Sequence, residues 1–305
     1  MKNIRIGNGE LTASEISLGC MRISNLSKNE ASELINAALE EGINFFDHAD
    51  IYGGGKSEEI FADAVGMKPS IREKMIIQTK CGIRDGYYDF SKEHIMNSVE
   101  GSLKRLKTEY IDILLLHRPD TLMEPEEVAE AFDMLHSSGK VRYFGVSNHN
   151  PMQIELLSRY LNQKIIVNQL QLSIVHTGMI DSGLNVNMKI DSSIDRDGSI
   201  LEYCRLKDIT IQAWSPFQYG FFEGVFIDNP KFPELNAKLQ EIARKWHVTS
   251  SAIAIAWILR HPAKIQPIVG TTNSERLKDI CKASEVKLTR EEWYEIYRAA
   301  GNKLP

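Results

Sequence analysis

The sequence has few of the features that mark secreted or metal-binding proteins. Its 305 residues include four cysteines, at positions 20, 81, 204 and 281, and no two of them form a Cys-x-x-Cys pair. This spacing indicates neither a zinc site nor a disulfide framework, so we expect small buried thiols in a reducing compartment. Because Cys20 and Cys81 each follow an expected strand, redox sensitivity near a functional site is a second, minor hypothesis.

Long apolar runs and strong charge patches are also missing. No stretch of about 18 apolar residues occurs, and the first residues lack the apolar core of a signal peptide. The net charge is −5 and the charges are scattered, which is not typical of a nucleic-acid or membrane-surface protein. His-Glu-x-x-His is absent. We therefore expect a cytoplasmic protein that binds no metal, nucleic acid or membrane.

Two nucleotide-binding motifs are absent or incomplete. Gly-x-Gly-x-x-Gly does not occur, which disfavours a Rossmann domain. The run Gly53-Gly54-Gly55-Lys56-Ser57 resembles the end of a phosphate-binding loop, but the position that requires the first glycine is Asp50. A carboxylate there repels phosphate, so these glycines are expected to let the backbone turn sharply behind Tyr52.

Short apolar segments alternate with helical patterns along the chain. Strands are expected at residues 16–18, 43–46, 74–79, 111–116, 143–147, 165–168, 210–214 and 265–269. Helices are expected at about 27–41, 57–64, 91–106, 125–138, 151–160, 199–206, 234–246, 250–259, 274–283 and 289–300. Without a linker-like break in composition, this pattern predicts an α/β protein with one domain over residues 1–305, a (β/α)8 TIM barrel. A doubly wound sheet is the alternative, although it usually has five or six strands.

Additions at the two ends and one irregular segment complete the prediction. Residues 4–6 and 11–13 flank Asn8-Gly9 and predict an N-terminal β-hairpin, and the segment 289–300 predicts a C-terminal helix. Residues 176–199 are rich in Asp, Ser, Gly and Asn and are expected to form a long functional or mobile loop. With Met21 and residues 218–228, that loop is expected to determine which substrate is bound.

Titratable side chains follow three successive strands of the expected barrel. Barrel active sites form at the carboxyl ends of the strands, where Asp47 and Tyr52, then Lys80, then His117 are found. Lys80 is expected to lower the pKa of the Tyr52 phenol, and Asp47 to supply the counter-charge of Lys80. His117 is expected to hydrogen-bond a carbonyl oxygen of the substrate. Each of these four side chains also has an ordinary structural explanation, but together the four predict a proton-donating pocket.

The other strand ends contribute further residues to the same rim. In chain order these are Gly19, Met21, Arg22, Ser147, Asn148, Gln169, Trp214, Ser215, Pro216, Gly270, Thr271 and Arg276. Their convergence on one face of the barrel is more informative than any single residue.

With these residues in this order, the sequence resembles the aldo-keto reductase superfamily. The residues that carry the resemblance are Asp47-x4-Tyr52-Gly53, Lys80 after residues 76–79, His117 after residues 114–116, Gly145-Val146-Ser147-Asn148, Trp214-Ser215-Pro216, and Gly270-Thr271 followed by Arg276. They occur in the order of the family and extend from residue 16 to residue 284.

The resemblance implies reduction of a carbonyl substrate with NADP(H) bound across the barrel mouth. Tyr52 is then the general acid, Lys80 lowers its pKa, Asp47 holds Lys80 and His117 orients the carbonyl. The family places a carboxamide-binding group at Ser147, Asn148 and Gln169, and a stacking aromatic residue at Trp214, for which a core indole is the alternative. The remaining rim residues are assigned to cofactor binding.

The residues expected around the 2′-phosphate of the cofactor depart from the usual pattern of the family. Arg276 matches the family arginine that pairs with the 2′-phosphate, but Gly270 and Thr271 stand where many members have Lys and Ser. Asp279 and Ile280 replace a Glu-Asn pair. NADPH is still expected over NADH. An NADPH-binding redox sensor or regulatory subunit with little turnover is the alternative function, and His48 has no assigned role.

Overall fold

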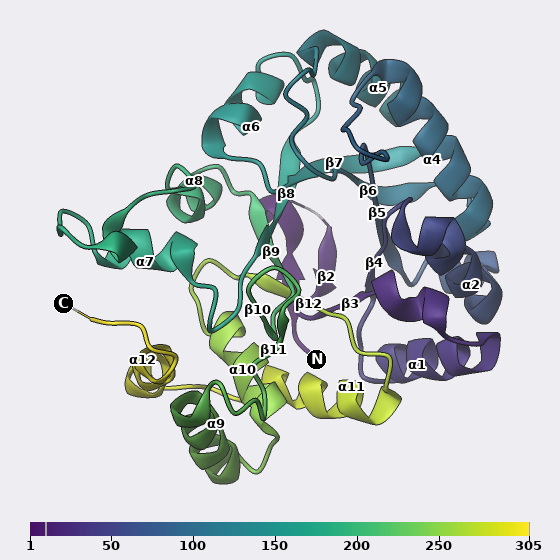
Figure 1. Ribbon diagram of the computed structural model, residues 1–305. Helices are drawn as coiled ribbons and strands as arrows, with labels where there is room; N and C mark the ends of the chain where they lie inside the picture. The colour runs from purple at the N-terminus through teal and green to yellow at the C-terminus, as the bar shows by residue number, and fades with distance from the viewer. Residues whose placement is uncertain (10, 305) are drawn as a thin grey trace.

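Eight parallel strands close into a barrel in the computed structural model, which describes residues 1–9 and 11–304. In barrel order they are β12 (Gln266–Val269), β3 (Ser17–Gly19), β4 (Phe45–Asp47), β5 (Ile76–Cys81), β6 (Ile111–Leu116), β7 (Val141–Ser147), β8 (Ile165–Gln171) and β9 (Thr210–Trp214). Strand β12 pairs with both β3 and β9, which closes the ring (Figure 1). The predicted (β/α)8 fold is confirmed, and its assignment to a single domain stays a prediction.

Helices surround the barrel and cover the outer faces of its strands (Figure 1). They are α1 (Lys28–Glu40), α2 (Lys56–Val65), α3 (Pro69–Arg72), α4 (Lys92–Leu106), α5 (Pro125–Ser137), α6 (Pro151–Ser158), α7 (Gly178–Leu184), α8 (Ile200–Leu206), α9 (Pro233–Trp246), α10 (Ser250–Leu259), α11 (Ser274–Cys281) and α12 (Arg290–Ala299). The capping box expected from Ser27 and Glu30 opens α1. Every residue of β6 is buried, as its apolar sequence predicts. None of the described helices is both long and apolar enough to cross a bilayer.

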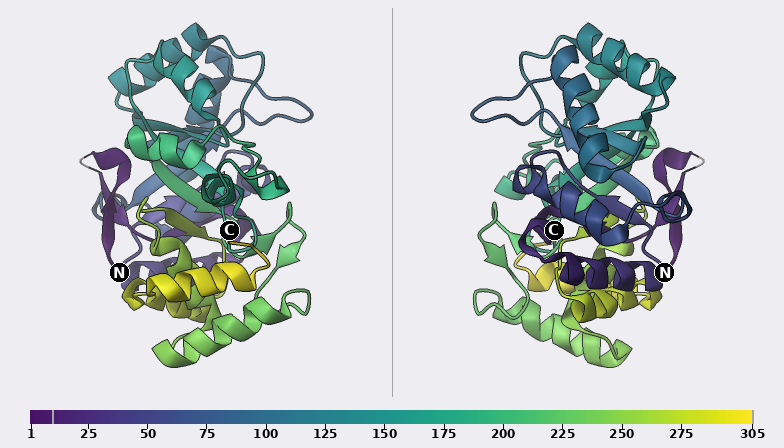
Figure 2. Two further views of the ribbon diagram at one scale, coloured as in Figure 1. Left: turned by 90° about the vertical axis from the view of Figure 1, so that its left-hand side faces the viewer. Right: turned by 90° about the vertical axis from the view of Figure 1, so that its right-hand side faces the viewer.

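The predicted N-terminal hairpin forms from β1 (Asn3–Arg5) and β2 (Thr12–Ser14). Figure 2 shows it at one end of the barrel, opposite a second hairpin of β10 (Gln218–Tyr219) and β11 (Gly224–Val225). Between β1 and β2, the 3-10 turn η1 (Ile6–Asn8) buries Ile6 among barrel residues such as Ile166. Gly7 has φ +60°, and a Cβ there would lie 2.5 Å from the Cβ of Ile166. The amino-terminal end of the barrel is thus covered, and the site forms at the other end.

The segment 176–199 is more regular than its composition indicates. It contains α7 and the 3-10 turn η4 (Asp191–Ser193), where an irregular loop is expected. Helix α7 buries Met179 and Ile180, and its Asp181 accepts a hydrogen bond from Tyr297 of α12 at 2.6 Å. These long-range contacts stabilise a helix that local composition does not predict. Helix α3 and the hairpin of β10 and β11 are likewise additions to the expected elements.

Candidate active site

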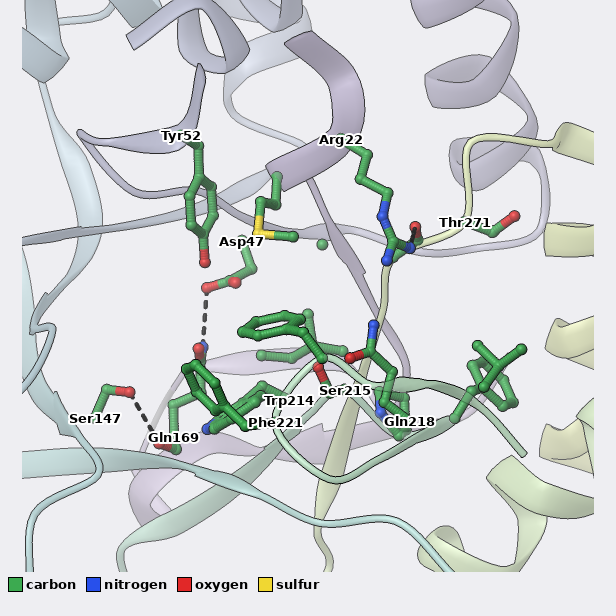
Figure 3. A pocket seen from close by; sticks show the side chains of 18 of the residues that line it. Arg22, Asp47, Tyr52, Ser147, Gln169, Trp214, Ser215, Gln218, Phe221 and Thr271 are labelled. Carbon is green, nitrogen blue, oxygen red and sulfur yellow. Dashed lines mark hydrogen bonds between the residues drawn. The ribbon is translucent and has the colours of Figure 1, made fainter. Parts of the chain in front are cut away.

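One cavity of about 970 Å³ opens at the carboxyl ends of the strands. It is lined by every predicted site residue except Lys80, namely Gly19, Met21, Arg22, Asp47, Tyr52, His117, Ser147, Asn148, Gln169, Trp214, Ser215, Pro216, Gly270, Thr271 and Arg276. Figure 3 shows Tyr52 on one side of this cavity and Thr271 on the other, with Arg22 between them in this view. The structure therefore brings together residues that are spread over more than 250 positions of sequence.

Lys80 does not line the cavity itself, but it hydrogen-bonds two residues that do, Asp47 and Tyr52. The side chain is fully buried, and its Nζ donates to Asp47 Oδ2 at 2.8 Å, to the His48 carbonyl at 2.7 Å and to Tyr52 Oη at 3.1 Å. These three acceptors match the three protons of an ammonium group. The order of the chain explains the arrangement, because Asp47 ends β4, Lys80 lies near the end of β5, and Tyr52 begins the 3-10 turn η3 (Tyr52–Gly55).

The pKa shifts in this group correct one expectation. Burial raises the pKa of the Tyr52 phenol, and although the Lys80 ammonium acts in the opposite direction, it does not reverse the shift. The phenol was expected to have a lowered pKa, so that prediction is wrong for the net effect and right for the contribution of Lys80. Burial by itself disfavours the charge of Lys80, but Asp47 and Tyr52 raise its pKa above the usual value. Tyr52 is thus a protonated donor beside a permanent cation.

Asp47 is in turn held by a chain of glutamine amides inside the barrel. Its Oδ1 accepts from Nε2 of Gln78 at 2.6 Å and of Gln169 at 3.0 Å, and both amides also donate to Gln212 Oε1. Gln212 donates to Gln266 at 2.8 Å. Sequence reasoning placed only Gln169 in the site. A Gln in a short, mostly apolar strand, as at Gln78, Gln212 and Gln266, is the signal that could have found the others.

His117 follows β6 and faces Tyr52, with ring centroids 6.0 Å apart and nearly perpendicular planes. Burial, together with the charges of Lys80 and Arg118, lowers the pKa of His117 well below its usual value. The imidazole is therefore neutral at pH 7 and carries one N–H. Its Nδ1 is buried without a hydrogen-bond partner among the described residues. A neutral imidazole at the cavity wall is suited to donate a hydrogen bond to a carbonyl oxygen.

Two glycines behind Tyr52 are required by the backbone. Gly53 has φ +61°, and a Cβ there would lie 2.5 Å from Ser24 Cβ. Gly55 has φ +92°, and its Cβ would lie 2.7 Å from Arg105 Cδ. An L side chain at either position would be strained and would clash. This supports the interpretation of the glycine run as a sharp turn.

The remaining buried groups near the site have structural explanations. His48 is fully buried against Phe61, and burial lowers its pKa to about 3, so its contribution to the site is the backbone carbonyl that accepts from Lys80. Cys20 and Cys81 are buried, and burial raises the pKa of both thiols well above the usual value. Such thiols are poor nucleophiles, which favours the structural explanation over redox sensitivity.

A second hydrogen-bonded chain borders the cavity and begins at Gln169, which also donates to Asp47. Ser147 Oγ donates to the Gln169 carbonyl at 3.0 Å, Asn148 Nδ2 donates to Ser147 Oγ at 2.8 Å, and Trp214 Nε1 donates to Asn148 Oδ1 at 3.0 Å. Trp214 is partly exposed at the cavity wall and stacks on Phe222, with ring centroids 6.0 Å apart. It is therefore not a core indole.

The far end of the cavity carries two arginines. Arg276 lies in the first turn of α11, which is capped by Asn273, and its side chain is exposed. Arg22 reaches across from η2 (Met21–Asn25) and donates to the Gly270 carbonyl at 3.1 Å. A guanidinium thus lies beside Gly270, where the resemblance leads one to expect a lysine. The sequence did not indicate this contact, because Arg22 and Gly270 are 248 residues apart.

A comparison with protein families agrees with this geometry. The model of the Aldo/keto reductase family matches residues 15–300. The chain belongs to this family. Membership indicates an oxidoreductase that reduces carbonyl groups, in a family that generally uses a nicotinamide cofactor.

Individual aldo/keto reductases and related oxidoreductases resemble the chain over nearly its full length. The oxidoreductase YcsN of Bacillus subtilis is 38% identical over 321 aligned positions that cover 100% of both chains. The 6-dehydroglucose reductase of Agrobacterium fabrum is 36% identical, with 96% of each chain covered. Among solved structures, the thermostable aldo-keto reductase Tm1743, crystallised with the inhibitor epalrestat, has a TM-score of 0.79 and 26% identity, covering 98% of this chain and 100% of its own.

Proposed function

We propose that this aldo/keto reductase reduces an aldehyde or ketone to an alcohol with NADPH, and that Tyr52 is the general acid. The observation that carries the proposal is the hydrogen-bonded series from Tyr52 through Lys80 to Asp47, which ends at the cavity surface in the phenol. A protonated phenol next to a buried ammonium is suited to give a proton to an oxygen that is gaining negative charge.

The roles of the side chains follow from their contacts. The substrate carbonyl oxygen accepts hydrogen bonds from the Tyr52 hydroxyl and from the neutral His117 ring, which hold it in place. Tyr52 then transfers its proton, and Lys80 stabilises the phenolate that remains. Asp47 keeps Lys80 charged, and the amides of Gln78 and Gln169 keep Asp47 in place. NADPH, when bound, supplies the hydride that the carbonyl carbon receives.

The residues along the cavity fit a dinucleotide of this kind. The amide and hydroxyl groups of Ser147, Asn148 and Gln169, which line the cavity, are assigned to the nicotinamide carboxamide, and Trp214 offers an aromatic face. At the other end, the guanidinium groups of Arg22 and Arg276 are assigned to the 2′-phosphate. The other predicted residues, Gly19, Met21, Ser215, Pro216, Gly270 and Thr271, line the wall between these groups. The position of Arg22 supports NADPH over NADH despite the missing lysine.

The test is the substitution Tyr52→Phe, which removes only the hydroxyl. Turnover of 4-nitrobenzaldehyde, followed by NADPH consumption, is expected to fall about 10²- to 10⁴-fold, while NADPH binding measured by fluorescence stays close to wild type. Tyr87→Phe is the matched control, because Tyr87 is exposed in a nearby loop and does not line the cavity. Near-normal turnover by Tyr52→Phe would show that the proton comes from another group.

The relatives also guide the choice of substrates for a screen. The enzyme of Agrobacterium fabrum is named as a reductase of 6-dehydroglucose, an oxidised sugar. We therefore place oxidised sugars beside simple aldehydes and ketones in a panel scored by NADPH consumption.

A further inference from the structure

Some of the charged side chains that line the cavity are paired with other groups of the protein, whereas Arg118 has no such partner in the part of the chain that the structure describes. Asp47 is paired with Lys80, and Arg22 donates to the Gly270 carbonyl. Arg118, which directly follows His117, also lines the cavity. Among the described residues, no group accepts a hydrogen bond from its guanidinium or forms an ion pair with it.

The surroundings of Arg118 do not explain an unpaired cation. Arg118 Cζ lies over the ring of Trp214, 5.7 Å from its centroid, a distance at which the ring contributes only weakly to pairing the charge. Asp120, two residues away, uses its carboxylate to accept from the backbone amides of Phe90 at 3.0 Å and Leu122 at 2.9 Å. Asp228 also lines the cavity, but no ion pair joins it to Arg118 in the described part of the chain. A partly buried cation without a protein partner costs free energy unless a ligand pairs with it.

The position of Arg118 places this cation next to the reacting group. Its charge contributes to the lowered pKa of His117, so the two side chains share one electrostatic environment. Arg118 also borders a second cavity of about 590 Å³ that adjoins the first at Trp214. The carboxylates there are engaged, because Asp181 accepts from Tyr297 and Thr177, and Asp197 accepts from the Ile200 amide.

We propose that Arg118 binds a carboxylate of the substrate, so that the preferred substrates are aldehydes or ketones that carry a carboxylate on the same molecule. This inference rests on the proposed carbonyl reduction at the same site. The planar fork of a guanidinium matches a carboxylate in two parallel hydrogen bonds. The carbon skeleton of the substrate then lies against apolar side chains of the wall, among them Ile51, Ile83, Tyr88 and Phe222. One cation at this end suits a monoanion better than a phosphate dianion.

The test compares 4-carboxybenzaldehyde with its neutral analogue, methyl 4-formylbenzoate. Wild-type protein is expected to reduce the acid with kcat/KM about 10- to 100-fold above that of the ester, the range of a charge-assisted hydrogen bond. Arg118→Gln is expected to remove this preference by raising KM for the acid much more than KM for the ester. Arg118→Lys keeps the charge without the fork and should retain part of the preference. Arg159→Gln is the charge-matched control, because Arg159 is exposed at the end of α6.

Binding of the products provides a readout that needs no turnover. Tryptophan fluorescence is used to titrate 4-(hydroxymethyl)benzoate and its methyl ester, and Arg118→Gln is expected to weaken only the acid, by about tenfold or more. One outcome is that wild type reduces neither aldehyde while Arg118→Gln still binds 4-(hydroxymethyl)benzoate more weakly than wild type does. In that case the proposed reduction fails and the assignment of Arg118 stands. If wild type reduces acid and ester equally well, or if Arg118→Gln keeps the preference for the acid, the assignment of Arg118 is overturned and the reduction stands.

Discussion

The two ends of the cavity differ in how completely their charged side chains are paired with other groups of the protein. At the end that holds Tyr52, proposed as the catalytic end, the side chains of Lys80 and Asp47 are 0% and 4% exposed, and each has its hydrogen bonds supplied by other residues of the protein. At the far end, the Arg276 side chain is exposed, and Arg22 contacts only a backbone carbonyl. The first end is organised before any ligand arrives, whereas the second is available to bind one.

This difference predicts different consequences of substitution. A change within the buried group disturbs the free energy of unfolding as well as activity, because an ion pair loses a partner in a place that water does not reach. A change at the exposed end alters ligand affinity and leaves stability nearly constant. Substitutions at the two ends therefore test whether stability and ligand affinity can be changed separately.

The largest effect is expected for Asp47→Asn, which leaves the Lys80 ammonium buried without a counter-charge. The free energy of unfolding is expected to fall by about 3–5 kcal/mol, measured by urea denaturation. Adding Lys80→Met removes the orphaned charge, so the double variant is expected to be more stable than Asp47→Asn alone. Equal stability of the single and double variants would show that the ion pair does not determine the stability of this end. Both variants are expected to lose turnover.

A smaller effect, confined to binding, is expected for Arg276→Ala. The Kd of NADPH is expected to rise about 10- to 100-fold, the range for a hydrogen bond to a charged group, while the Kd of NADH changes little. Thermal denaturation should be close to wild type, because the side chain is exposed.

Lys278→Ala is the control for Arg276→Ala. Lys278 lies on the same helix, α11, pairs with Glu275 at 2.9 Å and does not line the cavity. Lys278→Ala should leave the Kd of NADPH and the Kd of NADH unchanged. Equal losses for NADPH and NADH in Arg276→Ala would mean that the 2′-phosphate is recognised elsewhere.

The effect that is confined to one pH range concerns Asp50, three residues after Asp47. Burial and the nearby Glu58 carboxylate raise the pKa of Asp50 to about 6, with Arg105 acting in the opposite direction. The folded protein therefore binds more protons than the unfolded chain between about pH 4 and pH 6, so this group makes stability fall as pH rises through that window. Asp50→Asn should flatten that fall by about 3 kcal/mol, roughly 5 °C in Tm.

The comparison for Asp50→Asn is made across pH 4 to 8 by thermal denaturation. Asp85→Asn serves as the control, because Asp85 is exposed in the loop after β5. If the Tm of Asp50→Asn changes with pH in parallel with the Tm of wild type, Asp50 is not the cause of the fall in stability.

Much of the fold and of the site was predictable because local patterns carried the information. The apolar run of β6 and the capping box at Ser27 predicted their elements, and the strand ends predicted Asp47, Tyr52, Lys80 and His117 as neighbours. Helix α7 was not predictable from composition, because its stability depends on the contact of Asp181 with Tyr297.

The sequence by itself determined the order of the strands and the chemistry at their ends, since period, capping and residue type are local properties. Only the tertiary structure decided how that chemistry is held. The amides of Gln78 and of Gln169, the latter from across the barrel, donate to Asp47, Arg22 lies at the Gly270 carbonyl, and Arg118 is left with no described partner. The physical reason is that charge pairing and burial depend on distance in space, which for these residues is unrelated to distance along the chain.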